Sequence, residues 1–205
     1  VRAAQTRPPA YEPFSIVGCG KLPAVADDLL SLREYLDMPE DTSRYYELAE
    51  GVVQVSPHSG TRHQRVVMLL CRQLDDQLPA GWESIHQVEV VIGPRTPATV
   101  RAPDVVLISV DRLKETPEYL NAADVVLAME VVSPGSRRLD NVTKLNEYAR
   151  AGIPYFWIID PDGGPTLTAY ELIDGDYRTV DTVTGRFDVE RPFPLSINIK
   201  ALVAY

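Results

Sequence analysis

The spacing of apolar residues along the chain predicts three helices. Leucines recur at helical spacing within Val25–Met38, and a longer run after Thr61 places its apolar residues on one face. Thr61 and Gln64 fit a capping box, which predicts that the second helix starts at this point. The third helix is predicted over Asp140–Ala151, because a glycine and a proline follow it closely.

Apolar runs bounded by turn residues predict the strands. Tyr45–Ser56 reads as a hairpin that reverses at Glu50-Gly51, and a closing hairpin is expected across Asp174-Gly175. The other strands and the short C-terminal element are predicted at Ser84–Ile92, Asp104–Val110, Val125–Val132, Tyr155–Asp160, Leu167–Ile173, Asp176–Val180 and Ile197–Val203. Helices interleaved with strands predict one α/β domain over residues 25–205, preceded by an N-terminal arm over residues 1–24.

Composition agrees with a globular domain of this size. The chain has 205 residues, of which 45% are hydrophobic and 24% charged. No apolar run approaches the roughly 20 residues that span a bilayer, and no secretory signal is visible, so a cytoplasmic location is the default expectation. Cys19 and Cys71 show neither a disulfide framework nor zinc spacing, and no nucleotide-binding glycine loop occurs.

The net charge of −9 argues against a protein that binds nucleic acid through a broadly basic surface. A phosphate backbone would need locally concentrated basic residues, or a metal ion that supplies positive charge at the site. The charge therefore keeps open a function other than nucleic-acid chemistry.

Two carboxylates are the first candidates for chemistry. Glu130 interrupts the apolar run VVLAMEVV, where an ionised side chain costs several kcal/mol unless a cation or hydrogen-bond donors face it. Asp104 directly precedes the buried run VVLIS, and two such carboxylates at the ends of neighbouring strands suit Mg²⁺. Equally, Glu130 fits a structural ion pair, and Asp104 fits a strand end or an Asx turn.

The third helix supplies a candidate cation. Val142, Leu145 and Ala149 are expected to form its packed face, and Lys144 and Tyr148 form a row beside that face. From this position Lys144 could reach the carboxylates, orient the attacking water and offset charge on a phosphoryl transition state.

Further candidates have more ordinary alternatives. His63, at the start of the second helix, could contact a phosphate or move a proton, although a hydrogen-bonded helix-end histidine is the commoner case. Glu47 in the first hairpin could add a carboxylate, although such residues are usually solvated. The loop Ser133–Ser136 could hold an anion, although a plain polar loop is more usual.

Several ordered segments resemble one bacterial family. They are YYELAEGVVQVSP, RHQRVV, RAPDVVLIS and EVVSPGSRRLDNVTKLNEYARAGIPYFWIIDP, followed by YELIDGDY and LSINIKAL. Together they resemble the Uma-two family of "putative restriction endonucleases" in the PD-(D/E)XK nuclease superfamily, from about Asp28 onward. The resemblance implies a restriction-endonuclease-like core, in which helices flank a mixed central β-sheet.

The resemblance also implies roles for individual residues. Asp104 and Glu130 would be ligands of Mg²⁺ or Mn²⁺, and the carbonyl oxygen of Val131 would be a third ligand. In the superfamily a lysine is expected two residues after the acidic residue, where this chain has Val132. Members of the resembling family carry that lysine on the following helix instead, which here implies Lys144. The catalytic set would then be completed by residues lining the site, namely Glu47, Tyr148 and His63.

Two functions follow as hypotheses. The first is a Mg²⁺-dependent endonuclease that hydrolyses DNA, with homodimerisation as a convenient way to cut two strands. The second is a catalytically silent module that keeps the nuclease fold for binding nucleic acid or protein. The acidic charge and the lack of a separate DNA-reading motif favour the second modestly.

Overall fold

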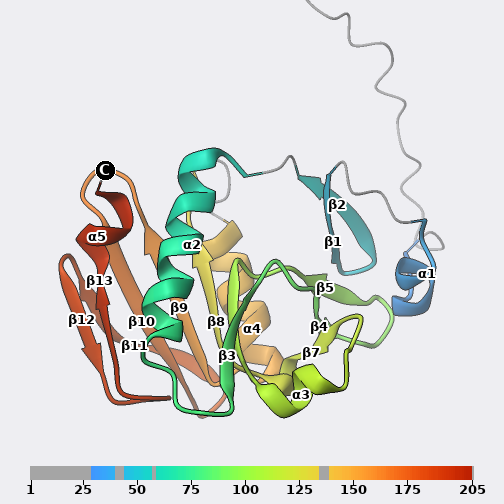
Figure 1. Ribbon diagram of the computed structural model, residues 1–205. Coiled ribbons are helices and arrows are strands. Elements are labelled where there is room, and N and C mark those ends of the chain that lie inside the picture. Colours follow the sequence, from blue (N-terminus) through green and yellow to red (C-terminus); the bar gives the residue numbers. More distant parts are fainter. Residues whose placement is uncertain (1–28, 40–43, 57–58, 134–138, 205) are drawn as a thin grey trace, which may run out of the picture.

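The strands of the computed structural model form three sheets, flanked by helices (Figure 1). The structure describes residues 29–39, 44–56, 59–133 and 139–204, with the backbone alone for 139–141. The predicted arm over residues 1–24 and Cys19 lie outside these ranges. Within them, no helix is long and apolar enough to cross a membrane.

The largest sheet has six strands and forms the centre of the molecule. In order across the sheet they are β11 (Asp176–Val183), β10 (Thr166–Ile173), β9 (Tyr155–Asp160), β8 (Val125–Val131), β6 (Val105–Ser109) and β3 (Trp82–His86). Strands β8 and β9 run parallel and the other pairs run antiparallel, so the sheet is mixed.

The second sheet has five strands and lies beside the first (Figure 1). Its order is β2 (Val52–Ser56), β1 (Tyr45–Ala49), β5 (Thr99–Arg101), β4 (Val90–Gly93) and β7 (Leu120–Asn121). The short helix α1 (Leu32–Leu36) packs on it, and Tyr35, Leu48 and Val100 belong to its small core. A third, two-stranded sheet joins β12 (Arg186–Val189) to β13 (Leu195–Asn198).

Helices cover both faces of the six-stranded sheet, because successive strand residues point to opposite faces. On one face, Leu127, Met129 and Val131 of β8 pack in a core with α2 (Thr61–Asp75) and α5 (Ile199–Val203). On the other face, Ala128 and Val132 pack in a core with α4 (Leu145–Ala151). The prediction of an α/β core with a mixed sheet flanked by helices is confirmed, and the strands divide over three sheets.

The first two predicted helices begin at other residues than expected. Helix α1 starts at Leu32, because Ser31 is its N-cap and exchanges hydrogen bonds with Glu34; the part of the prediction before residue 29 is not described. The capping box at Thr61 is wrong. Thr61 is already helical, and Gly60 stands at the N-cap without a side-chain hydrogen bond.

The predicted strand Ser84–Ile92 is two strands, β3 and β4, in different sheets. Between them Gln87 has φ 56°, a left-handed conformation that ends the extended run. The predicted Asp104–Val110 strand ends earlier, because α3 (Val110–Lys114) begins after Ser109 caps it. The C-terminal element is β13 followed by α5.

The third predicted helix begins with a wide π-helical turn, Leu139–Lys144, that continues into α4. This turn changes the expected packed face. Val142 is 53% exposed, whereas Tyr148 is fully buried. The i, i+3, i+4 spacing assumed for a uniform α-helix fails where the turn is wider.

Candidate active site

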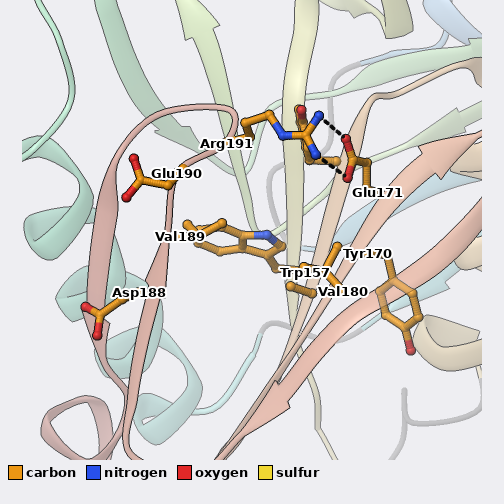
Figure 2. A pocket seen from close by; sticks show the side chains of 10 residues that line it. Trp157, Tyr170, Glu171, Val180, Asp188, Val189, Glu190 and Arg191 are labelled. Carbon is orange, nitrogen blue, oxygen red and sulfur yellow. Dashed lines mark hydrogen bonds and ion pairs between the residues drawn. The ribbon is translucent and has the colours of Figure 1, made fainter.

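Polar side chains gather in two separate regions of the described structure. One is a pocket of about 270 Å³ whose lining includes Tyr155, Tyr170 and Asp188 (Figure 2). At its rim, Arg191 forms two contacts with Glu171, at 3.0 and 3.2 Å. The pocket shares no residue with the second region, and Ser133 does not line it. The remainder of the candidate anion loop, residues 134–136, lies outside the described residues.

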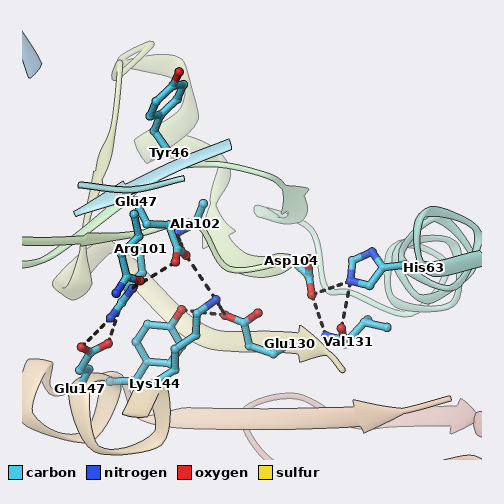
Figure 3. A network of polar contacts seen from close by, with 12 residues as sticks. Tyr46, Glu47, His63, Arg101, Ala102, Asp104, Glu130, Val131, Lys144 and Glu147 are labelled. Carbon is cyan, nitrogen blue, oxygen red and sulfur yellow. Dashed lines mark hydrogen bonds and ion pairs between the residues drawn. The ribbon is translucent and has the colours of Figure 1, made fainter. Parts of the chain in front are cut away.

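The second region is a polar network at the end of β8 (Figure 3). It contains the candidates Glu47, His63, Asp104, Glu130, Val131, Lys144 and Tyr148. Glu130 lies near the end of the strand, on the face that α4 covers. Lys144 Nζ and Tyr148 Oη both donate to Glu130 Oε1, each at 2.8 Å. The side chains of Glu130 and Lys144 are 4% and 6% exposed, so the ion pair is almost completely shielded from solvent.

Asp104 and His63 meet on the other side of Glu130 (Figure 3). Asp104 Oδ2 accepts a hydrogen bond from the Val131 amide at 2.7 Å. His63 Nε2 lies 3.1 Å from the same carboxylate oxygen and 2.9 Å from the Val131 carbonyl oxygen. A carbonyl oxygen can only accept, so Nε2 carries a hydrogen that two oxygens share. The helix-end histidine is therefore hydrogen-bonded to two of the candidate metal ligands.

Glu47 joins the network from the five-stranded sheet. Its Oε1 accepts from the Ala102 amide at 3.0 Å and lies 3.3 Å from Lys144 Nζ. Its Oε2 lies 3.1 Å from Arg101 Nη1. Glu47 is thus held on three sides and is mostly buried, rather than solvated like most strand glutamates.

Burial and charge shift two pKa values in this network. The pKa of Tyr148 is raised well above its usual value by burial first, and then by the charges of Glu130 and Glu47. For Arg101, burial acts to lower the pKa, but the hydrogen bonds with Glu147 and the charge of Glu47 outweigh it, and the pKa is raised. Tyr148 therefore stays a neutral donor and Arg101 stays a cation.

The donor set fits a hard divalent cation. Asp104 Oδ2 and the Val131 carbonyl oxygen converge on one point, because a single hydrogen-bond donor reaches both. Mg²⁺ is commonly held by one or two carboxylates with waters filling the other positions, so Asp104, Glu130 and the Val131 carbonyl oxygen are donors of the kind that would suit it. A group of three His, Cys, Asp or Glu side chains that could hold a metal by themselves is absent from the described residues.

The residues that sequence reasoning missed are Arg101, Glu147 and Gln54. They come from three separate elements, and Arg101 contacts both of the others. The available signal was a charged residue next to the apolar stretch that precedes Asp104. That signal does not reveal the partners, because they lie about 46 residues away in either direction along the chain.

Comparison with solved structures identifies the fold. A protein from Anabaena variabilis, described as "a putative nuclease belonging to DUF820", superimposes with a TM-score of 0.66 at 20% sequence identity. The match covers 85% of this chain and 97% of the other. The fold is therefore that of this nuclease-like protein, and the low identity supports no further conclusion.

The family follows from the sequence match. The profile of the Uma2 family, described as "Putative restriction endonuclease", matches residues 32–201. The chain belongs to this family, and the resemblance noted in the sequence is confirmed. No match was found among proteins with curated descriptions.

Proposed function

We propose that this protein is a Mg²⁺-dependent endonuclease that hydrolyses phosphodiester bonds of DNA. The observation that carries the proposal is the convergence of Asp104 Oδ2 and the Val131 carbonyl oxygen beside Glu130, with a buried lysine on the same glutamate. Membership of a family named for restriction endonucleases supports the choice of substrate.

Each residue has a proposed task. Asp104, Glu130 and the Val131 carbonyl oxygen hold Mg²⁺ (or Mn²⁺), which supplies Lewis-acid polarisation of the phosphate and activation of the attacking water. Lys144 orients that water and offsets the charge that develops on the phosphoryl group. Tyr148 and Glu47 hold Glu130 and Lys144 in place, and His63 Nε2 is a side-chain proton donor to Asp104, at 3.1 Å.

The local charge balance supports a cation here. The network contains four carboxylates, of Glu47, Asp104, Glu130 and Glu147, and two cationic side chains, of Arg101 and Lys144. With neutral His63, two formal negative charges remain, which a divalent ion compensates. A bound ion also answers the objection raised by the net charge of −9, because it presents positive charge to the phosphate.

The decisive experiment is a cleavage panel with Mg²⁺ and Mn²⁺ on double-stranded, single-stranded and branched DNA. We expect wild type to cut at least one substrate and Asp104→Asn and Lys144→Ala to lose the activity. Lys200→Ala, which removes an exposed lysine, is the matched control and should cut like wild type. Equal background cutting by wild type and Lys144→Ala would rule out the mechanism.

The alternative is a silent module that binds nucleic acid or protein, which the acidic net charge favours. Calorimetric titration with Mg²⁺ and Mn²⁺ separates the two functions. Metal binding that Asp104→Asn abolishes supports the enzyme, whereas no binding by wild type supports the module. The single domain over residues 25–205, the homodimer and the cytoplasmic location remain predictions alongside both functions.

A further inference from the structure

We infer that Arg101 is a positioning residue that fixes Lys144 against Glu130 by clamping α4 to the five-stranded sheet. The inference rests on the proposed function for its catalytic consequence, but its structural part does not depend on activity. Arg101 is only 1% exposed, so it cannot itself touch substrate and acts through its neighbours.

One guanidinium group joins three elements. Arg101, the last residue of β5, donates from Nε and Nη2 to the two carboxylate oxygens of Glu147 on α4, each at 2.8 Å. Its Nη1 reaches Glu47 on β1 at 3.1 Å and Gln54 on β2 at 2.9 Å. The first hairpin, β5 and α4 therefore share one buried cation (Figure 3).

The two carboxylates that Arg101 binds, of Glu147 and Glu47, both affect the position of Lys144. Glu147 lies three residues after Lys144 on the same helical segment. The bidentate contact with Arg101 therefore fixes the rotation of that segment about its own axis, and with it the direction in which Lys144 points. Glu47 is the second acid near Lys144, since its Oε1 lies 3.3 Å from the Lys144 amine. Arg101 thus sets both the helix that carries the lysine and one of the two carboxylates that hold its amine.

The clamp requires an arginine. A planar guanidinium presents five donors in a fixed fork, which matches one bidentate carboxylate and two further acceptors at once. A lysine at position 101 offers a compact charge with three donors and cannot span Glu147 and Glu47 in the same way. Arg101→Lys, which keeps the positive charge but loses the planar guanidinium, should therefore fail to hold Glu147 and Glu47 in their positions.

The consequence for catalysis is measured with Arg101→Lys and Arg101→Gln. Because Asp104 and Glu130 are unchanged and buried Arg101 does not touch substrate, we expect KM and Mg²⁺ affinity to stay within about twofold, while kcat falls about tenfold to a hundredfold, as misplaced catalytic groups do. Arg112→Gln is the matched control. Arg112 also pairs with two carboxylates, of Glu115 and Asp124, neither of which belongs to the network described above.

The structural part is measured by amine labelling and mass spectrometry, which needs no activity. The chain has four lysines, and exposed Lys114 and Lys200 serve as internal references for buried Lys144. We expect Lys144 to be the slowest of these three to react in wild type and to react at least several-fold faster in Arg101→Gln. Circular dichroism checks that the variant is folded. Should Arg101→Gln not fold, Glu147→Gln breaks the same bidentate contact at a partly exposed position.

The outcomes separate the two proposals. If wild type cuts no DNA but Lys144 becomes labelled in the variants, the proposed function fails and the clamp stands. If Lys144 stays protected in folded Arg101 and Glu147 variants, or if kcat is unchanged in an active enzyme, the clamp is overturned. Recovery of full kcat by Arg101→Lys would also overturn it, because charge alone would then suffice.

Discussion

Two arginine–carboxylate pairs in this protein are both bidentate but have opposite surroundings. Arg101 binds Glu147 through two contacts of 2.8 Å, and Arg191 binds Glu171 through contacts of 3.0 and 3.2 Å at the rim of the pocket. The side chain of Arg101 is 1% exposed, whereas that of Arg191 is 70% exposed. The amount of water around the cation therefore differs greatly between the two pairs.

That difference decides what each pair contributes. An exposed pair is screened by water and contributes about 0–1 kcal/mol. A buried charge that loses its partner costs about 3–5 kcal/mol, because the remaining charge stays desolvated. The buried network of Arg101, Glu130 and Lys144 is therefore rigidly specified, and the pocket pair is not.

The largest effect is expected from breaking the buried ion pair on one side. Lys144→Met leaves Glu130 without its cation and should lower the free energy of unfolding by about 3–5 kcal/mol. The double variant Glu130→Gln with Lys144→Met should be more stable than the single one, because no charge is left unpaired. Urea denaturation measures both.

The matched control for this prediction is Lys200→Met, at an exposed lysine, which should stay within about 0.5 kcal/mol of wild type. A loss of less than about 1 kcal/mol in Lys144→Met would contradict the comparison, since the buried pair would then behave like a surface pair.

The second effect concerns alkaline pH. The folded-state pKa of Tyr148 is raised, chiefly by burial, so its contribution to stability is complete below the unfolded pKa of about 10 and is lost as the pH rises beyond it. We expect the free energy of unfolding to fall above about pH 10, with a smaller fall in Tyr148→Phe. Urea denaturation at several pH values, with tyrosinate absorbance, measures this. An equal fall in both proteins would contradict the prediction.

A smaller effect is expected for metal affinity. His63 Nε2 donates to two oxygens that we assign to Mg²⁺, so His63→Ala removes a competitor worth about 0.5–1.5 kcal/mol and should tighten Mg²⁺ binding about two- to tenfold. Calorimetry measures the change, and exposed His86→Ala is the control. Weaker binding in His63→Ala would instead place the imidazole among the metal ligands.

The smallest effect is expected at the pocket. Arg191→Gln breaks the exposed pair with Glu171 and should lower the free energy of unfolding by less than about 1 kcal/mol, with no change in DNA cleavage. The same urea titration measures it. A loss as large as that in Lys144→Met would show that exposure does not separate the two regions.

Much of the site could be predicted because apolar runs in the sequence show which charged residues will be buried. A glutamate inside VVLAMEVV needs a counter-charge, and the structure places Lys144 and Tyr148 on it. The strand β8 and the hairpins were equally visible, since apolar runs and turn residues define them locally. The tight turn of the first hairpin has positive φ at Glu50 and Gly51, as its sequence suggested.

The rest depends on contacts between distant segments. The run SIHQVEVVI contains no glycine or proline that would mark a break, and the left-handed backbone at Gln87 sends the chain into another sheet. Arg101 looked like an ordinary charged residue because its partners approach only after both sheets and α4 are assembled. The packed face of the third helix was predicted wrongly at Val142, because no sequence pattern indicates the π-helical turn that precedes α4.

The placement of the lysine on a helix changes how such a site can be found. In a strand, a glutamate and a lysine two residues apart lie on the same face, so the pair forms a short sequence motif with fixed spacing. Here position 132 is a buried valine, and the amine arrives from a residue fourteen positions downstream. The contact between amine and carboxylate forms without that spacing in the sequence. Searches that look for fixed spacing will pass over chains like this one, whereas searches for a lone acid in an apolar strand will not.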